Sequence, residues 1–236
     1  MAKTLGFIAD RFIAAGYAPV VTGRDRLGDN LLRLELESPD FTTATTTPGD
    51  SFAIMFSRND FRHYTPAVLD RGTGRLTVIV GLHGNGPGED VVLGLSVGDE
   101  LPMMKWANRR NFVFDDGPAP IVVIGDATVI GLAMAFRDRI GASGRGFRAI
   151  LEVPAADVAA TAELVPGADV QAVGDTPGAA ILTHLAAASF TDGSVFYLAG
   201  HGQSIQQQRT VLREVHSVPR KAIRTQPFWA TGKVGL

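Results

Sequence analysis

Residues 120–140 read PIVVIGDATVIGLAMAFRDRI, and this stretch decides the class of fold. The apolar run Pro120–Ile124 ends at a glycine, which is typical of a short strand buried on both faces. Apolar residues then recur at helical spacing over Ala127–Ile140, and Asp126 or Thr128 stands where a helix N-cap is expected. The stretch therefore predicts a strand, a tight turn and a helix, which begin a parallel βαβ unit.

The same alternation continues toward the C-terminus. The patterns predict strands and helices in turn at Phe147–Val153 (strand), Asp169–Val173 (strand), Gly178–Ala188 (helix), Ser194–Leu198 (strand) and Ser204–His216 (helix). Such alternation builds a parallel sheet with right-handed crossovers, and a ligand on such a sheet lies outside the carboxyl ends of its strands. We expect the turns Gly125-Asp126 and Gly200-His201-Gly202 on that edge.

The N-terminal half follows a different pattern. Short alternating or β-branched segments separated by turn sequences predict strands at Tyr17–Thr22, Asn30–Glu37, Ser51–Ser57, Arg75–Leu82 and Ser96–Met103. In the second of these, Leu32, Leu34 and Leu36 share one face, as expected of a half-buried antiparallel strand. Several such strands in half of the chain predict a small closed barrel.

Length and composition agree with two compact units. The chain has 236 residues, of which 45% are hydrophobic and only 19% charged, and this excludes collagen, coiled coil and long disorder. The pattern changes at Asp115–Pro120. We therefore expect a β-barrel domain over residues 1–116 and an α/β domain over residues 117–236.

The sequence contains no cysteine, which excludes disulfides, thiolate nucleophiles, cysteine-bound zinc and iron–sulfur clusters. Any redox chemistry must therefore use a bound cofactor. No run approaches the ~18 apolar residues of a membrane span. Asp10 and Arg11 interrupt the N-terminus where a signal peptide needs an unbroken apolar region, so we expect a cytoplasmic protein.

The net charge of −2 provides no global field for nucleic acid, but the C-terminal tail is basic. From Ile205 onward, Glu214 is the single acid among six basic residues, namely Arg209, Arg213, Arg220, Lys221, Arg224 and Lys233. These cations could bind a phosphate group or another anionic partner, or they could serve only for solubility.

The segment Phe61–Pro66, FRHYTP, offers the groups that a planar cofactor with a phosphate tail needs. In an extended segment, Arg62 and Tyr64 share one face and Thr65 lies opposite. This arrangement supplies a guanidinium for phosphate, an aromatic platform, and a hydroxyl or amide for a ring nitrogen. The alternative is an ordinary edge strand with Arg62 and Tyr64 in solvent.

Four further segments carry weaker signals. The glycine-rich turn Leu82–Gly88 leads into a short helix whose N-terminus suits a phosphate, although such a turn needs no ligand. Gly125–Thr128 fits an N-cap and a nucleotide site equally, and it lacks the full G-x-G-x-x-G fingerprint. Val195–Gly202 and Pro227–Lys233 each join aromatic residues to a glycine turn.

In this order, the five segments resemble the motifs of the siderophore-interacting protein family, a branch of the ferredoxin-NADP reductase superfamily. That family runs R-x-Y-T, H-G-x-G-P, G-D-x-T, A-G-E and Y-W-x-x-G. The matching segments here are Arg62–Thr65, His83–Pro87, Gly125–Thr128, Ala199–His201 and Phe228–Gly232. The resemblance covers nearly the whole chain.

The resemblance implies a six-stranded antiparallel Greek-key flavin barrel followed by a parallel α/β nucleotide domain. Family members reduce ferric siderophores and release Fe(II), with electrons passing from NADPH, NADH or a ferredoxin through FAD. Tyr64 and Thr65 would lie beside the reacting flavin ring as catalytic residues, and no protein metal site is implied. For the basic tail, the resemblance adds three possible uses beside solubility: holding the 2′-phosphate of NADPH, attracting an anionic siderophore complex, and docking an acidic ferredoxin. The implied cofactor-binding residues are Arg62, His63, Tyr64, Thr65, His83, Gly84, Gly86, Pro87, Gly125, Asp126, Thr128, Gly200, His201 and Trp229.

Five features depart from the family pattern. Ala67 replaces an arginine, Gly131 a proline, and His201 the acid of A-G-E. Gly88–Leu95 lacks a common tryptophan, and Pro102–Trp106 replaces a G-P-x-G turn. Two alternatives therefore stay open: a non-reducing siderophore-binding or biosynthetic accessory protein on the same fold, and a flavin reductase with a different acceptor.

Overall fold

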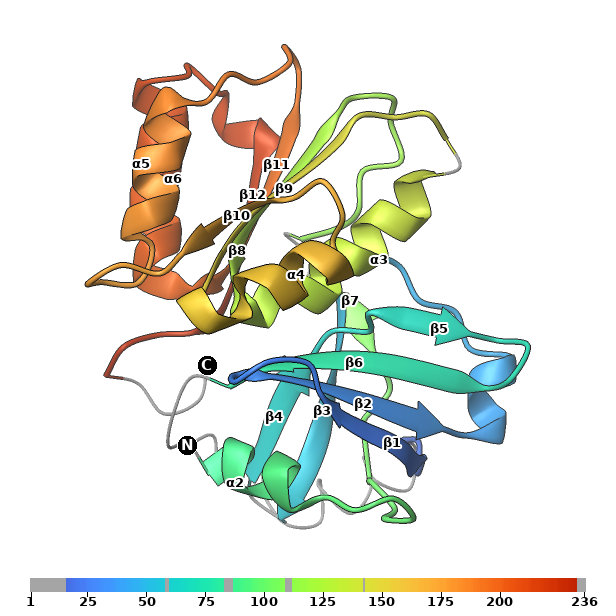
Figure 1. The fold of residues 1–236 in the computed structure, drawn as a ribbon. Coiled ribbons are helices and arrows are strands. Elements are labelled where there is room, and N and C mark those ends of the chain that lie inside the picture. Colours follow the sequence, from blue (N-terminus) through green and yellow to red (C-terminus); the bar gives the residue numbers. More distant parts are fainter. Residues whose placement is uncertain (1–15, 58–59, 83–86, 109–111, 142, 233–236) are drawn as a thin grey trace.

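The computed structural model describes residues 16–57, 60–82, 87–108, 112–141 and 143–232. Its N-terminal half contains two antiparallel sheets (Figure 1). The first has the order β1-β2-β6-β5, and its strands are β1 (Val20–Arg26), β2 (Leu31–Glu37), β6 (Arg75–Gly81) and β5 (Val68–Asp70). The second has the order β4-β3-β7, with β4 (Asp60–Tyr64), β3 (Asp50–Ser57) and β7 (Ala107–Asn108).

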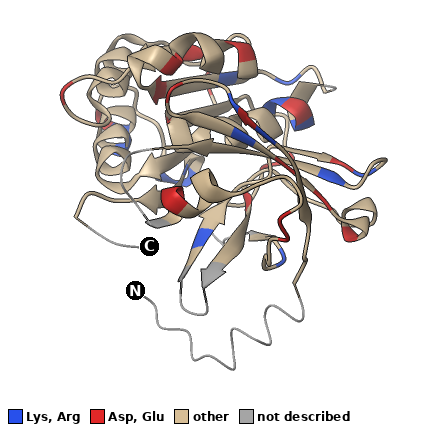
Figure 2. Ribbon diagram, turned by 60° about the horizontal axis from the view of Figure 1, so that its bottom comes forward, with Lys and Arg blue, Asp and Glu red and all other residues tan. Residues whose placement is uncertain are grey.

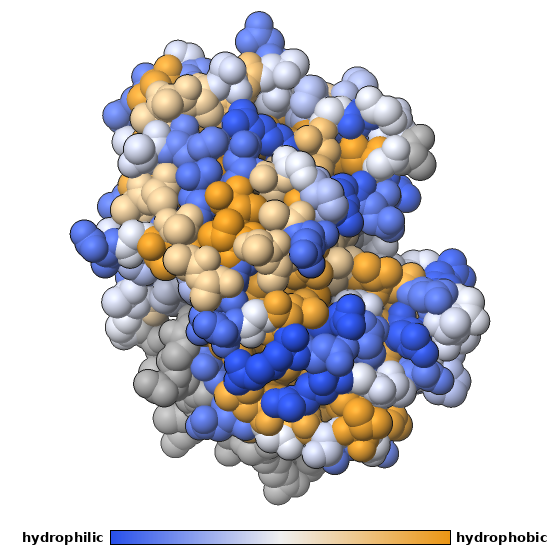
Figure 3. All heavy atoms as spheres, viewed as in Figure 1, coloured by the Kyte–Doolittle hydropathy of each residue, from blue (hydrophilic) through white to orange (hydrophobic). Residues whose placement is uncertain are grey.

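One core lies between the two sheets. It contains Leu32, Leu34 and Leu36 of β2, all fully buried, so the predicted inward face of this strand is confirmed. Phe41 and Phe52 fill the same core. Outward-facing side chains of β2 are charged, and Figure 3 shows hydrophilic surface over this sheet. This inside–outside alternation is what stabilises a half-exposed antiparallel sheet.

The predicted strand Ser96–Met103 is a connection between the sheets rather than one continuous strand. Its residues form isolated bridges, Val20 with Glu100 and Ile54 with Met103. The Leu101 amide donates to Pro19 on one side, and the Met55 amide donates to the carbonyl of Pro102 on the other. Because proline has no N–H group, Pro102 can accept but not donate in such a ladder.

The C-terminal half is a five-stranded parallel sheet in the order β10-β9-β8-β11-β12. Its strands are β8 (Ile121–Asp126), β9 (Phe147–Val153), β10 (Asp169–Ala172), β11 (Val195–His201) and β12 (Ile223–Trp229). The predicted order of an antiparallel β half followed by a parallel α/β half is therefore confirmed. The chain leaves β8 for β9 on one side and reaches β11 on the other, which makes the end of β8 a topological switch point.

Helices cover both faces of this sheet (Figure 1). The 3-10 turn η2 (Ala127–Val129), α3 (Ile130–Gly141) and α4 (Val158–Leu164) lie on the face toward the β half, and α5 (Ala179–Ala187) and α6 (Gly202–Glu214) lie on the other. Alternate residues of β8 serve the two faces: Ile121 and Val123 enter the first core, Val122 and Ile124 the second. This explains the uninterrupted apolar run in the sequence.

The two halves share packing. Leu31, Ala67 and Ile79 of the β half belong to the same buried cluster as α3. Asp157, fully buried at the end of the 3-10 turn η3 (Ala155–Asp157), accepts hydrogen bonds from the backbone N–H and the side-chain amide of Asn30, at 3.1 and 3.0 Å. Figure 3 shows hydrophobic side chains where the halves meet. The helix α2 (Pro87–Gly94) belongs to the β half: Gly88 lies next to the Arg62 side chain of β4, and Arg24 of β1 donates to the carbonyl of Leu93 at 2.8 Å.

Candidate nucleotide-binding site

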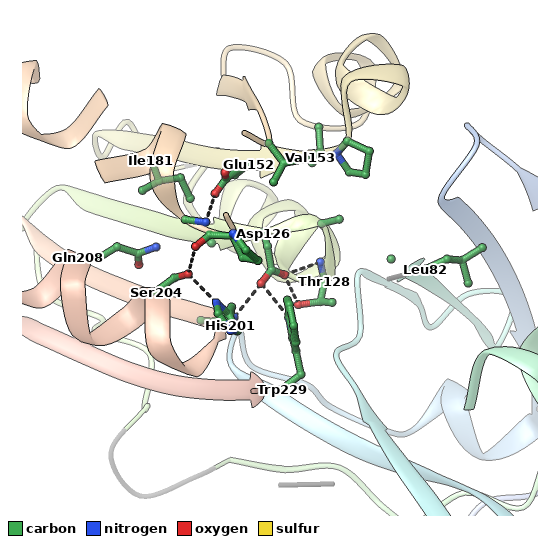
Figure 4. A pocket seen from close by; sticks show the side chains of 18 residues that line it. Leu82, Asp126, Thr128, Glu152, Val153, Ile181, His201, Ser204, Gln208 and Trp229 are labelled. Atoms are coloured by element: carbon green, nitrogen blue, oxygen red, sulfur yellow. Dashed lines mark hydrogen bonds between the residues drawn. The ribbon is translucent and has the colours of Figure 1, made fainter. Parts of the chain in front are cut away.

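A cavity of about 240 Å³ lies at the carboxyl ends of β8, β9 and β11, the edge that the sequence predicts for a ligand (Figure 4). Gly81 and Leu82, at the end of β6, border the cavity from the β half. A Cβ atom on Gly81 would lie 2.9 Å from the backbone of Ala127, so the two halves meet closely at this border. The cavity is therefore bounded by both halves of the chain.

Asp126 is the centre of the hydrogen bonds at the mouth of the cavity (Figure 4). Its Oδ1 accepts from the backbone N–H and the hydroxyl of Thr128, at 2.9 and 2.5 Å. Its Oδ2 accepts from the backbone N–H of His201 at 2.7 Å and from the indole Nε1 of Trp229 at 2.9 Å. One carboxylate therefore caps η2 and also joins the ends of β8, β11 and β12. The N-cap reading of the sequence is therefore confirmed, and the nucleotide-site reading of Asp126 stays a prediction.

His201 is buried, its ring stacks on an aromatic side chain, and both of its ring nitrogens have hydrogen-bond partners. Its ring stacks on Trp229 with centroids 4.3 Å apart. Because the Ser204 hydroxyl donates to the carbonyl of Pro177, it accepts from His201 Nδ1 at 2.7 Å, and this leaves Nε2 to accept from the Thr231 hydroxyl at 3.0 Å. Burial lowers the pKa of His201, and nearby Asp126 opposes this only in part. The imidazole is therefore neutral where the family motif has an acid.

Two glycines make this packing possible. Gly200 has a φ of 93°, and a Cβ atom there would lie 2.4 Å from Asp126 Oδ2. Gly178 has a φ of 90°, and its Cβ would lie 2.3 Å from the Ser204 hydroxyl oxygen. Both positions combine a left-handed backbone with close approach, so a side chain at either would displace the polar network.

The inner end of the cavity contains two buried polar side chains that the sequence reading missed, Glu152 of β9 and Gln208 of α6. They are 3% and 1% exposed. Glu152 Oε2 accepts from the backbone N–H of Gly178 at 2.6 Å, and burial raises the pKa of this carboxyl. Glu152 Oε1 and Gln208 Oε1 have no partner within hydrogen-bond geometry, although the backbone N–H groups of Ala180 and Gly174 lie near the Glu152 carboxylate and oppose the rise of its pKa. The signal in the sequence is an acid inside the apolar strand FRAILEV.

The segment Arg62–Thr65 lies in the β half and does not line this cavity. It is extended as predicted, since β4 pairs with β3. The alternative reading is right that β4 is an edge strand, since among the described strands it pairs only with β3. It is wrong in placing Tyr64 in solvent, because this ring packs against Phe52, with ring centroids 6.2 Å apart, and burial raises its pKa. Thr65 is buried as well. His63 is exposed, with its ring edge-on to Phe61.

Arg62 lies against the start of α2. A Cβ atom on Gly88 would lie 2.9 Å from Arg62 Cγ, so the guanidinium stem crosses the first turn of that helix. Of the predicted phosphate residues, Pro87 begins α2. His83, Gly84 and Gly86 lie outside the described residues.

The structure therefore brings together Gly125, Asp126, Thr128, His201 and Trp229 at the cavity, with Gly200 directly behind Asp126.

Two departures from the family motifs are neighbours in space. Ala67 is 3% exposed and belongs to the core shared with α3. A Cβ atom on Gly131 would lie 3.4 Å from Ala67 Cβ and 3.5 Å from the Thr65 hydroxyl. The small residues at positions 67 and 131 therefore let the segment after β4 pack directly on the start of α3.

The described part of the chain contains neither a cluster of metal ligands nor a membrane-spanning helix. No group of three or more metal-ligating side chains is gathered within it. None of its helices combines the length and the apolar character that crossing a membrane requires.

Comparison with known proteins identifies relatives. Residues 119–232 match the model of the siderophore-interacting protein family. The fold is similar to the siderophore-interacting protein SipS of Aeromonas hydrophila, with a TM-score of 0.74, 21% identity and 92% of each chain covered. A siderophore utilization protein from T. fusca gives a TM-score of 0.73 at 19% identity, covering 93% of this chain and 94% of the other.

The fold also matches a domain of a different enzyme. The FAD/NAD-binding domain of a nitric oxide dioxygenase from Vibrio cholerae gives a TM-score of 0.69 at 16% identity, covering 91% of this chain and 99% of that domain. A search of curated proteins finds no match. This chain therefore shares its fold with these proteins.

Proposed function

We propose, from the premise that the α/β half of this chain belongs to the siderophore-interacting protein family, that the protein is a flavin-dependent reductase that releases iron from ferric siderophores as Fe(II). The observation that carries the proposal is the position of the cavity. It lies at the carboxyl ends of β8, β9 and β11, and Gly81 and Leu82 of the β half border it. A dinucleotide held there would therefore extend toward the β half.

The β half carries a donor set that fits a flavin nucleotide. Arg62 crosses the first turn of α2, so a guanidinium and a helix N-terminus converge, which suits a pyrophosphate. Tyr64 supplies an aromatic side chain for the flavin ring, and Thr65 a buried hydroxyl close to α3. We propose that these three residues hold FAD. The remaining residues of this proposed site are His63, His83, Gly84, Gly86 and Pro87.

Bound FAD would supply the redox chemistry, taking electrons from a nicotinamide or a ferredoxin and delivering them singly to iron. The chain itself binds and orients. Asp126 holds Thr128 and Trp229 at the mouth of the cavity, and the neutral His201 adds no second charge beside that carboxylate. Fe(II) is bound more weakly than Fe(III) by hard oxygen ligands, so release needs no protein nucleophile, in accord with a chain without cysteine.

The test is spectroscopic. The purified full-length chain, incubated with FAD and desalted, should keep the yellow flavin spectrum, and Arg62→Ala should weaken FAD retention. Under anaerobic conditions, NADH or NADPH should bleach the flavin bands. With a ferric siderophore and a coloured ferrous chelator, about two Fe(II) should appear for each dinucleotide oxidised, because a hydride carries two electrons. A protein that stays colourless refutes the proposal.

The same measurements separate the alternatives. A yellow protein that neither dinucleotide nor a reduced ferredoxin can bleach would be a binding or accessory protein on this fold. A flavin that is reduced rapidly but is not reoxidised by any ferric siderophore would indicate a reductase with another acceptor.

The basic tail forms part of the proposed partner surface. Arg224 is occupied, since it pairs with Asp115 at 2.7 Å. Arg213, Arg220 and Lys221 are exposed, and both signs of charge are spread over the rest of the molecule (Figure 2). We propose that these three cations attract the anionic siderophore complex or an acidic ferredoxin. A Michaelis constant that rises with salt for one of these partners only would identify it.

A further inference from the structure

The inner end of the cavity is built to accept hydrogen bonds. The buried polar atoms without a partner that line it are Glu152 Oε1 and Gln208 Oε1, and both are acceptors. The structure places both side chains around one cavity, from β9 and α6 (Figure 4). A buried acceptor without a partner is costly, so a ligand that supplies hydroxyl or amide donors would be favoured here.

Glu152 is also held in place. Its other oxygen accepts from the backbone N–H of Gly178 at 2.6 Å, so the carboxylate cannot rotate freely away from the cavity. Gly178 in turn packs against Ser204, whose hydroxyl is already committed to Pro177 and His201. The orientation of the free oxygen is therefore set by the fold before any ligand arrives.

The charge of the cavity lining disfavours a phosphate group. Asp126 and Glu152 line the cavity, and no lysine or arginine does so among the described residues. A phosphate group next to Glu152 would meet a like charge without a compensating cation. Of the basic tail, the described cations Arg209, Arg213, Arg220, Lys221 and Arg224 lie elsewhere, and Lys233 is outside the described residues.

The position of Glu152 identifies the ligand group. It belongs to the strand next to the first strand of the parallel sheet, close to its carboxyl end, and in dinucleotide-binding sheets an acid in this region accepts from the hydroxyls of the adenosine ribose. Val153, Pro154 and Ile181 provide apolar walls beside it, which suit an adenine.

We propose that Glu152 is the residue that selects the dinucleotide, by accepting hydrogen bonds from a free ribose diol and repelling a 2′-phosphate, so that this site takes NADH and rejects NADPH. Gln208 contributes a second acceptor. The inference rests on the proposed function, because it concerns the nucleotide site of that reductase. It assigns to the basic tail a role other than holding the 2′-phosphate.

The experiment measures binding rather than turnover. Calorimetry on the full-length chain, with and without added FAD, compares NAD⁺ with NADP⁺ and ADP-ribose with 2′-phospho-ADP-ribose. We expect the unphosphorylated member of each pair to bind about tenfold tighter or more. Quenching of Trp229 fluorescence in a Trp106→Phe background gives a second readout, because Trp229 lines the cavity and Trp106 does not.

Glu152→Gln keeps an oxygen for the Gly178 N–H but removes the charge. It should weaken NAD⁺ binding and reduce the preference over NADP⁺ by about tenfold. Glu163→Gln, an exposed acid on α4, is the matched control and should change neither. Equal affinities of the unmodified chain for NAD⁺ and NADP⁺, or an unchanged preference in Glu152→Gln, would overturn the proposal.

The outcomes stay distinguishable from those of the proposed function. If Glu152→Gln fails to fold, the comparison of the two ligand pairs on the unmodified chain still decides. If the chain binds neither dinucleotide but holds FAD and is reduced by a ferredoxin, the inference about Glu152 is wrong and the proposed reductase function is still supported. If the chain prefers NAD⁺ but never retains FAD, the proposed reductase function is wrong and the proposed selection of NAD⁺ by Glu152 is still supported.

Discussion

Replacing Asp126 by asparagine tests whether one carboxylate holds the mouth of the cavity together. Asparagine has nearly the same shape, but one of its two terminal atoms is a donor. With its oxygen toward Thr128, the new NH₂ group would face the N–H groups of His201 and Trp229. With its oxygen toward those two groups, it would oppose the Thr128 N–H instead. Either orientation leaves donors facing donors.

The expected cost follows from the contacts. Hydrogen bonds to a charged acceptor each contribute about 1.5–3 kcal/mol. Two are lost with the amide oxygen toward Thr128, but only that of the Thr128 N–H with the oxygen toward His201 and Trp229, because the Thr128 hydroxyl can then turn to accept from the new NH₂ group. The second orientation is therefore preferred, and part of its loss is offset because asparagine, unlike aspartate, carries no charge to be partly buried. We expect the free energy of unfolding to fall by about 2 kcal/mol, which lowers the Tm by roughly 4–8 °C for a chain of this size.

The assay is urea unfolding followed by far-UV circular dichroism. Asp116→Asn is the control, because Asp116 is exposed and its ion pair with Arg139 at 3.4 Å is a surface contact, so its effect should stay within about 0.5 kcal/mol. Trp229→Phe keeps an aromatic ring but removes one of the donors to this carboxylate, and Asp126→Asn already weakens that bond, so the two changes together should cost less than the sum of the single changes. Additive costs, or a loss below about 0.5 kcal/mol for Asp126→Asn, would refute this reasoning.

Three further predictions concern the same site. Gly200→Ala should destabilise the protein by about 2 kcal/mol more than Gly193→Ala, because both have a positive φ but only the first would contact Asp126; equal losses in thermal unfolding would contradict this. The lowered pKa of His201 means that the unfolded chain takes up its proton more readily, so stability should fall as the pH drops below about 6.5, and His201→Gln should flatten this slope between pH 7.5 and 5.5. The raised pKa of Glu152 has the opposite sign, since ionisation costs stability as the pH rises; Glu152→Gln should stabilise the ligand-free protein at pH 8, with a gain that shrinks toward pH 5 in denaturant titrations.

The β8–α3 stretch shows which features of the fold the local sequence pattern can predict. A buried parallel strand is apolar on both faces and must end at a tight turn, so its sequence reveals it, and the edge where a ligand lies follows from the parallel arrangement. Residues 125, 126, 128 and 201 meet at this edge for that reason, whereas Trp229 reaches it at the end of β12.

Elements without a periodic pattern were not predicted. The strand β12 contains Pro227 and several polar side chains, and it forms because β11 lies beside it. The helix α4 has only seven residues, too few for a clear periodicity. In these cases long-range pairing and packing decide the structure, and local propensity does not.

By itself, the sequence determined the two-part architecture, the absence of thiol chemistry and the edge of the sheet where a site lies, because all three follow from composition and local periodicity. The tertiary structure decided what that site contains. Only packing shows that Glu152 and Gln208 are buried without partners, that Asp126 joins three strands, that His201 is neutral, and that the tail cations lie away from the cavity. Burial and hydrogen-bond partnership are properties of groups brought together from distant parts of the chain, and no local pattern encodes them.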